Sequence, residues 1–230
     1  QMCIRDSFRG IAVQGVQNFT ISNNTISGVL SSTASSSTMS GILVGGVVNG
    51  GVVSNNTIAD IYQQNTSGWG SNGIYLNSSS TAANVTVSNN IIRDIISYGY
   101  NDVTQADNGY GIMVNAGGGF NIYYNTVRMF ANQTSTTGQP AAINIASTIT
   151  TPGALNIRNN IFSNEQTVGG QRYAVLCKAT NNNIFASIDN NDYWKAAGTT
   201  NLAIFNTTNI TDVAGIVTNF GGNAASKSVA

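Results

Sequence analysis

The sequence predicts an all-β solenoid of about six to seven rungs, in which short strands of successive repeats pair in parallel. Three observations predict it: an internal repeat of about 33 residues, apolar residues that alternate with variable ones, and turns rich in Asn and Gly. Asn, Gly, Ser and Thr fill 105 of the 230 positions, but 41% of the residues are hydrophobic. That share is enough to form a core, so a disordered chain is not expected.

The repeat is anchored on the second residue of a recurring Asn-Asn pair, which in one copy is Tyr-Asn. The anchors are spaced by 32, 34, 35, 35 and 31 residues and are Asn24, Asn56, Asn90, Asn125, Asn160 and Asn191. Two residues after each anchor stands an apolar residue, and these form the column Ile26, Ile58, Ile92, Val127, Phe162 and Tyr193. Stacked strands lie about 4.8 Å apart, so we expect this column to form one interior ridge.

Five residues after the anchor, the first four copies have Val29, Ile61, Ile95 and Phe130, whereas the last two have Glu165 and Ala196. A second strand motif lies between the anchors, at residues 10–13, 41–44, 73–76, 111–114, 142–145, 174–177 and 203–206. Asn suits the bends because it tolerates left-handed backbone and bonds to the local chain. Stacked Asn amides also bond to one another as a ladder.

The chain divides into three parts. Residues 1–7 resemble a translated sequencing-library adapter and are excluded from the fold. Residues 8–208 are the repeats, and 209–230 are expected to be a truncated capping segment in which 212–217 has a helical pattern and 212–220 offers a cover. We expect a fragment of a longer protein that began further upstream, so the absence of a signal peptide carries no information about secretion. Segments 30–40 and 97–110 are predicted loops, which in repeat proteins often carry function.

Composition excludes several classes of function. Nine basic and nine acidic residues cancel, and a chain with 8% charged residues lacks the positive face that nucleic-acid binding needs. Polar residues interrupt every apolar run well before the roughly 20 residues of a membrane span. There is no His, which removes Ser-His, Cys-His and His-metal chemistry. Cys3 and Cys177 are too few and too far apart for a disulfide framework or a paired-cysteine zinc site.

The motif Asn-φ-x-φ-x-Asn-Asn-x-φ, with φ apolar, occurs at residues 18–26 and again at 84–92. Over roughly residues 10–206 the chain resembles the right-handed single-stranded parallel β-helix of the pectate-lyase-like superfamily, in its Asn-rich bacterial secreted type. Lyases of this type hold Ca²⁺ with clustered carboxylates and use Arg or Lys as the base. The Gly-His-Gly motif of the related hydrolases cannot occur here, because the chain has no His.

The repeat register places one charged group of side chains together. Asp60 and Asp94 stand four residues after their anchors, with Arg93 and Arg128 stacked in the preceding column. They are candidate metal ligands, and Asp102 and Asp107 in the longest predicted loop are two more. The alternative for the first group is a surface ladder of ion pairs that neutralises itself.

Aromatic residues supply the candidates for carbohydrate binding. Tyr98, Tyr100 and Tyr110 share the longest predicted loop, where their rings either stack on sugars or pin the loop onto the coils. Tyr123 is expected on the outward face beside Arg158, which in turn has Asp189 on its other side. Arg158 is the candidate base of a lyase-like face, and an inert surface Arg is its alternative. Residues 189–192 resemble part of a calcium loop but coincide with the anchor turn, so we interpret them as a turn.

The sequence therefore favours a fragment of an extracellular or cell-surface bacterial β-helix protein with a structural, adhesive or carbohydrate-binding role. A polysaccharide lyase acting on acidic glycans is the alternative. No cofactor is expected, and Ca²⁺ enters only under that alternative. The expected partner is a polysaccharide or a cell-surface glycan, with neither nucleic acid nor a membrane span.

Overall fold

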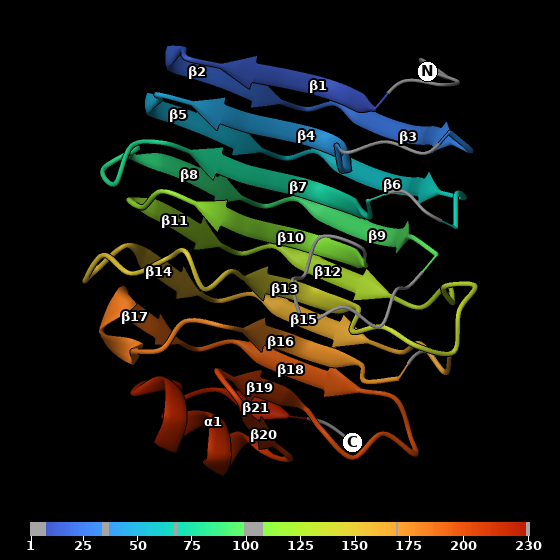
Figure 1. The fold of residues 1–230 in the computed structure, drawn as a ribbon. Coiled ribbons are helices and arrows are strands. Elements are labelled where there is room, and N and C mark those ends of the chain that lie inside the picture. The colour runs from blue at the N-terminus through green and yellow to red at the C-terminus, as the bar shows by residue number, and fades with distance from the viewer. Residues whose placement is uncertain (1–7, 34–36, 67–68, 99–107, 169, 229–230) are drawn as a thin grey trace.

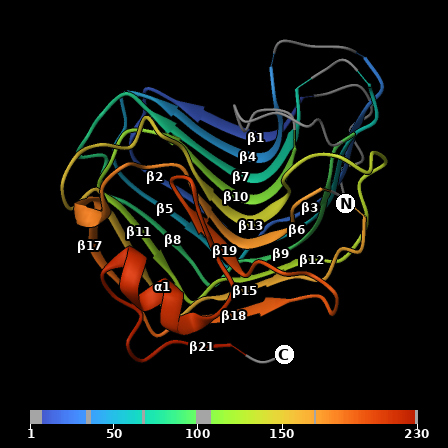
Figure 2. The same cartoon turned by 60° about the horizontal axis from the view of Figure 1, so that its bottom comes forward.

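The computed structural model describes residues 8–33, 37–66, 69–98, 108–168 and 170–228. The described chain is an all-β parallel solenoid of about six turns, which confirms the predicted fold class. Each turn contributes one strand to each of three sheets, as Figure 1 shows. Figure 2 looks more nearly along the stack and shows the sheets forming the sides of the solenoid around a common interior.

Sheet 1 contains the second strand motif. Its strands, in spatial order, are β1 (Arg9–Gln14), β4 (Met39–Gly46), β7 (Ser71–Ser78), β10 (Gly109–Ala116), β13 (Ala141–Ile145), β16 (Tyr173–Cys177), β19 (Ala203–Phe205) and β20 (Thr208–Ile210). Adjacent strands are parallel except for the last pair, β19 and β20, which is antiparallel.

Sheets 2 and 3 flank the Asn anchors. Sheet 2 precedes them and contains β2 (Gln17–Ser22), β5 (Asn49–Ser54), β8 (Val85–Ser88), β11 (Phe120–Tyr123), β14 (Leu155–Arg158) and β17 (Phe185–Asp189), the last entered from the 3-10 helix η1 (Asn182–Ile184). Sheet 3 follows them and contains β3 (Thr25–Ser31), β6 (Thr57–Gln63), β9 (Ile91–Ile96), β12 (Thr126–Met129), β15 (Ile161–Asn164), β18 (Asp192–Lys195) and β21 (Lys227–Ser228).

The predicted interior ridge is confirmed. Each member of the apolar column is the parallel-strand partner of the next one, and all six side chains are buried: Ile26, Ile58, Ile92, Val127, Phe162 and Tyr193. The rings of Phe162 and Tyr193 stack with their centres 6.1 Å apart. The ridge joins inward side chains of all three sheets in one core, so burial of apolar area along the whole stack stabilises the fold.

The Asn ladder is also confirmed, and it runs the full length of the stack between sheets 2 and 3. At each step the anchor amide Nδ2 donates to the anchor Oδ1 of the next turn over 2.9 to 3.0 Å. The same Oδ1 accepts the backbone N–H of the preceding anchor. From the second turn on, Nδ2 also donates to a sheet 2 carbonyl of the turn before. The ladder therefore satisfies polar groups at a bend buried between two sheets.

The first residue of each pair has a different task. It adopts the left-handed conformation in all six turns, with φ between 55° and 59°, at Asn23, Asn55, Asn89, Tyr124, Asn159 and Asn190. Asn reaches this conformation more cheaply than most residues, because its short polar side chain bonds locally. The pair thus separates two roles: the first residue turns the chain and the second bonds to the neighbouring turns.

Two departures from the predicted register have clear causes. Residues four after the anchor are left-handed in the first three turns, at Gly28, Asp60 and Asp94, which keeps the residue after them inside. The fourth turn lacks this bulge, so Met129 is buried and Phe130 is 43% exposed, contrary to its predicted place beside Ile95. In the last turn Ala203 pairs with Val175, one residue away from the predicted alignment with Ala174.

The first predicted loop is shorter than expected at both ends, and the second is shorter at its C-terminal end. β3 extends to Ser31 and β4 begins at Met39, so the first connection spans 32–38. β10 begins at Gly109, which places Tyr110 in a strand and not in the long loop.

The helix α1 (Val213–Phe220) lies at the C-terminal end of the stack, inside the segment predicted to offer a cover. The Asp212 carboxylate accepts the Gly215 N–H over 2.8 Å and caps its start, and left-handed Gly221 ends it. Phe220 packs against the rings of Phe205 and Phe185, with ring centres 5.1 and 5.7 Å away. The helix thus covers apolar side chains of the last turn.

Candidate functional site

The predicted Asp and Arg group lies on the outer side of sheet 3. Arg93 and Arg128 are strand partners, as expected. Asp94 is buried and forms an ion pair with Arg93 at 2.9 Å, and it also accepts the Ala131 N–H over 3.2 Å. Burial raises the pKa of Asp94 above its ordinary value, and these bonds together with the Arg93 charge partly offset the rise, while the charge of nearby Asp60 adds to it. The Asp94 carboxylate is thus already engaged by the protein.

Arg128 has a partner that the repeat register did not suggest. Its Nε and Nη2 donate to the two Glu165 carboxylate oxygens over 2.6 and 2.7 Å, and Ser163 Oγ donates to Glu165 Oε1 over 2.9 Å. The Arg128 guanidinium also lies 4.9 Å from the ring centre of Phe130. The hydrogen bond from Arg128 is the main cause that lowers the pKa of Glu165, and the same bond raises the pKa of Arg128.

These ion pairs agree with a ladder that neutralises itself. Within the part of the chain that the structure describes, no group of three or more Asp, Glu, Cys and His side chains could hold a metal ion. Asp102, Asp107 and Tyr100 lie outside the described residues.

A hollow of about 310 Å³ opens beside the Arg128–Glu165 pair on the outer face of sheet 3. Two outward columns of the last three turns line it: Thr126, Ile161 and Asp192 in the first, and Arg128, Ser163 and Trp194 in the second. The small Ser163 stands between two large side chains, which explains why the surface is depressed there. Ile161 is 45% exposed and gives the hollow an apolar floor.

The groups around the hollow differ in their free hydrogen-bonding capacity. Arg128, Ser163 and Glu165 bond to one another. Asp192 differs: its side chain is partly exposed, and within the described residues neither of its carboxylate oxygens accepts a hydrogen bond, although Oδ1 is buried. Among the described residues, none bonds to the Trp194 indole N–H or to the Thr126 hydroxyl. The hollow therefore presents an aromatic ring, one carboxylate acceptor and two donors to a ligand.

A second polar cluster lies on the outer face of sheet 2. Arg158 pairs in register with Tyr123 on one side and Asp189 on the other, as predicted. Its guanidinium lies 5.1 Å from the Tyr123 ring centre, and Nη2 donates to the Tyr123 hydroxyl over 3.4 Å. That hydroxyl donates to Asn121 over 2.8 Å and accepts from Asn156. The Tyr123 hydroxyl is saturated within the protein.

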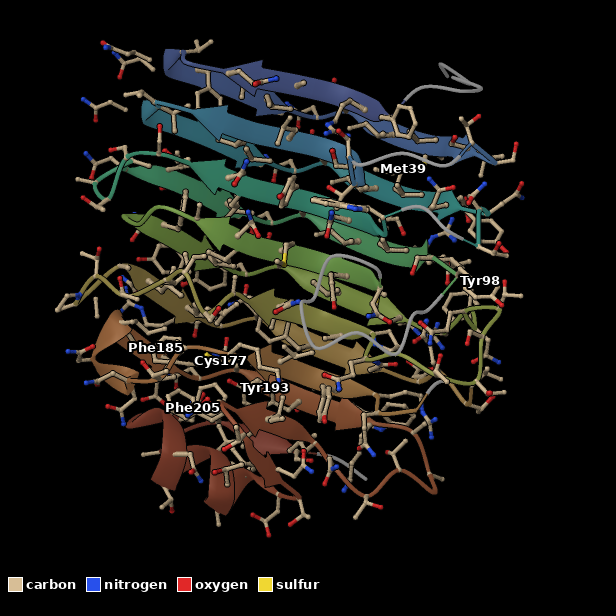
Figure 3. The ribbon with its side chains drawn as sticks, in the orientation of Figure 1. Met39, Tyr98, Cys177, Phe185, Tyr193 and Phe205 are labelled. Carbon is tan, nitrogen blue, oxygen red and sulfur yellow. The ribbon has the colours of Figure 1, made fainter. Side chains whose placement is uncertain are left out.

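The remaining predicted Tyr residues have different surroundings. Tyr98 lies two residues after the end of β9, and Figure 3 labels its half-buried side chain at the edge of the solenoid. Tyr110 is 1% exposed and packs with Met113 and Tyr173 on the outer face of sheet 1. The predicted place of Tyr110 in a loop is wrong, because the residue lies in strand β10 and is a buried member of a second apolar cluster. That cluster was not predicted.

Cys177 is a core residue. It lies inside the solenoid with Val175 and Leu202, and burial raises the pKa of its thiol to about 12. The thiol therefore stays protonated and unreactive at ordinary pH. Cys3 lies outside the described residues.

Sequence reasoning missed the residues that form the hollow. Trp194 was not singled out, Asp192 was assigned only to a turn, and Glu165 was recorded as a break in an apolar column. The break was the available signal, because a charged residue that replaces an apolar one in one repeat marks a local change of structure.

Two further comparisons bear on function. None of the described helices is long and apolar enough to span a membrane. No family model, no curated protein and no solved structure matches the chain. The fold and the hollow on sheet 3 therefore carry the functional argument.

Proposed function

We propose that this chain is part of an extracellular or cell-surface β-helix protein of the pectate-lyase-like type, and that it binds carbohydrate through the hollow on sheet 3 without catalysing a reaction. The observation that carries the proposal is the partly exposed Trp194 side chain, which lines the same hollow on the outer face of sheet 3 as Asp192 and Thr126. Sugars combine an apolar C–H face with a rim of hydroxyls, and such a site matches both.

The protonation states favour binding over catalysis. A general acid at neutral pH needs a raised carboxyl pKa, but Arg128 lowers that of Glu165. A guanidinium base needs a lowered pKa, but Glu165 raises that of Arg128. Asp94, the candidate ligand for Ca²⁺ under the lyase alternative, is held by Arg93 and the Ala131 N–H. These charged groups form ion pairs with one another, and the role that remains for the hollow is to bind a ligand.

The rigidity of the fold also supports a binding role. The hollow rests on strands β12, β15 and β18, which the ridge and the Asn ladder hold from the inside. A site on rigid strands loses little conformational entropy on binding. An extracellular glycan is the partner that fits a neutral protein whose surface is rich in Asn, Ser and Thr.

The test is a glycan array followed by titration of the best ligand into three proteins: the wild type, Trp194→Ala and Trp69→Ala. Trp69 is the matched control, because it is the other Trp of the chain, is 43% exposed and lies away from the hollow. We expect Trp194→Ala to weaken binding at least about tenfold, since an aromatic contact is worth about 0.5–1.5 kcal/mol beyond its buried area. Trp69→Ala should bind like the wild type.

Two results would contradict the proposal. Equal binding by Trp194→Ala and the wild type would place the site elsewhere. Release of unsaturated uronate from polygalacturonate in the presence of Ca²⁺, followed by ultraviolet absorbance, would favour the lyase alternative.

A further inference from the structure

We infer that the hollow on sheet 3 selects saccharides that carry a free protonated amine, of the hexosamine class, over saccharides that carry carboxylates. The inference rests on the proposed function and names the ligand class of the same site. It depends on which charged side chains of the hollow have no ion-pair partner within the protein.

Asp192 is the group that determines the selection. It is the first residue of β18, and it follows Ile161 in the outward column that lines the hollow. Its backbone N–H donates to the Asn160 carbonyl over 2.8 Å, which holds the residue at the end of the ladder bend. Its Oδ1 is buried, but the side chain as a whole is partly exposed, and within the described residues neither carboxylate oxygen accepts a hydrogen bond. A carboxylate with free acceptor capacity gains most from a charged donor.

Among the described residues, the other charged side chains near the hollow form no ion pair with Asp192. Arg128 and Glu165 both line it, but their bidentate pair cancels their charges. Lys195 Nζ donates to the Thr200 and Thr211 carbonyls over 2.9 and 3.0 Å. Lys227 is the strand partner of Asp192 on the far side, is exposed, and neither lines the hollow nor forms an ion pair with Asp192. The lining therefore carries one uncompensated negative charge.

The negative charge of Asp192 sets the order of affinity among the three classes of saccharide. An ammonium group donates a charge-assisted hydrogen bond to Asp192 while its sugar ring lies against Trp194. A neutral hydroxyl or acetamide donates a weaker one. A uronate brings a second carboxylate toward Asp192 and finds Arg128 already occupied by Glu165 on two of its nitrogens.

The experiment titrates three oligosaccharides of equal length at pH 6 and one ionic strength: glucosamine, N-acetylglucosamine and galacturonate oligomers. Each is titrated into the wild type, Asp192→Asn and Asp60→Asn. Asp60→Asn is the matched control, because it makes the same change of charge at an exposed residue of the second turn. Melting temperatures establish that both variants remain folded.

In the wild type we expect the glucosamine oligomer to bind about tenfold more tightly than the acetylated one, and the galacturonate oligomer to bind most weakly. Asp192→Asn should bring the first two ligands to within about twofold of each other and should strengthen galacturonate binding. Asp60→Asn should keep the order of the wild type.

An unchanged order in Asp192→Asn, or a wild type that prefers galacturonate, would overturn the inference. In either case, if Trp194→Ala still abolishes binding of all three ligands, carbohydrate binding at the hollow stands. If no saccharide binds the wild type, the proposed function fails and the inference fails with it.

Discussion

The two halves of sheet 3 have the same interior and different outer surfaces. Inside, every turn contributes a buried apolar residue to the ridge and an anchor to the Asn ladder. Outside, the first two turns carry Thr25, Ser27, Thr57 and Ala59, whereas the last three carry the charged and aromatic groups of the hollow. At a buried position or in the Asn ladder, contacts with the neighbouring turns restrict which residue can occur. At an outward position they do not. Function can therefore differ between turns of one uniform stack.

The boundary between the halves coincides with a change of backbone. The left-handed bulge at Gly28, Asp60 and Asp94 ends after the third turn. From the fourth turn on, the strand stays regular, and Glu165 takes the place at which Ile61 and Ile95 are buried in earlier turns. Loss of the bulge thus frees that position to pair with Arg128 on the surface.

The largest expected effect comes from breaking the interior at Ile92. Ile92 is 0% exposed, and its neighbour Ile91 is 52% exposed on the opposite face of the same strand. We expect Ile92→Asn to lower the free energy of unfolding by about 3–5 kcal/mol, since burial of the side chain contributes about 1.5–3 and an unpaired amide costs about 1–3. Ile91→Asn should change it by less than about 0.5 kcal/mol.

Chemical denaturation of the two variants under identical conditions measures the difference. Equal losses for Ile91→Asn and Ile92→Asn would show that the strand does not have one buried and one open face, and the ridge would be wrong.

The next effect separates the two residues of an anchor pair. Asn90 bonds to Asn56, Val53 and Asn125, so Asn90→Ala removes several buried hydrogen bonds and leaves their partners unpaired. We expect a loss of about 2–4 kcal/mol. Asn89→Gly keeps the left-handed backbone that this position requires and should cost less than about 1 kcal/mol. A larger loss for Asn89→Gly than for Asn90→Ala would reverse the roles assigned to the pair.

The inward positions could be predicted from the sequence because each is constrained by the same neighbours in every turn. The ridge, the ladder and the parallel pairing follow from residues that repeat, such as Ile58 and Asn90. Phe130 was misplaced because the left-handed bulge of the first three turns is absent from the fourth, and this change of backbone leaves no periodic mark in the sequence. Ala203 was misaligned because the last turn is one residue out of register.

The hollow could not be predicted, because it results from side chains that differ between turns. Trp194, Ser163 and Arg128 occupy one outward column, but no repeat rule relates their sizes. The pairing of Arg128 with Glu165 crosses from one turn to the next and depends on the regular strand of the fourth turn. Only Glu165 left a trace in the sequence, as a charged residue at an apolar position.

A smaller effect concerns the outer face of sheet 1. Asn144 is fully buried there, and its strand partners are Met113 and Leu176. Within the described part of the chain, neither its Oδ1 nor its Nδ2 has a hydrogen-bond partner. Leu would continue the apolar column without an unpaired amide. We therefore expect Asn144→Leu to raise the free energy of unfolding by about 1–2 kcal/mol, measured by urea denaturation. Asn144→Asp is the opposite control and should destabilise the fold. A loss of stability in Asn144→Leu would show that the amide makes a favourable contact.

The smallest effect tests the outer ion pair and depends on pH. Arg128 holds the pKa of Glu165 below its ordinary value of 4.5, so the folded state favours the ionised carboxylate. The contribution to stability is therefore complete above about pH 5 and is lost as the pH falls through the lowered pKa. Because the Arg128 side chain is 56% exposed and that of Glu165 24% exposed, solvent screens the pair, and we expect its contribution to be smaller than the effects of the interior substitutions. Glu165→Gln should lose that contribution at pH 7 and should equal the wild type near pH 2. Urea denaturation at a series of pH values measures the free energy of unfolding of both proteins. If the difference between them grows as the pH falls, the pair does not stabilise the fold in the way expected.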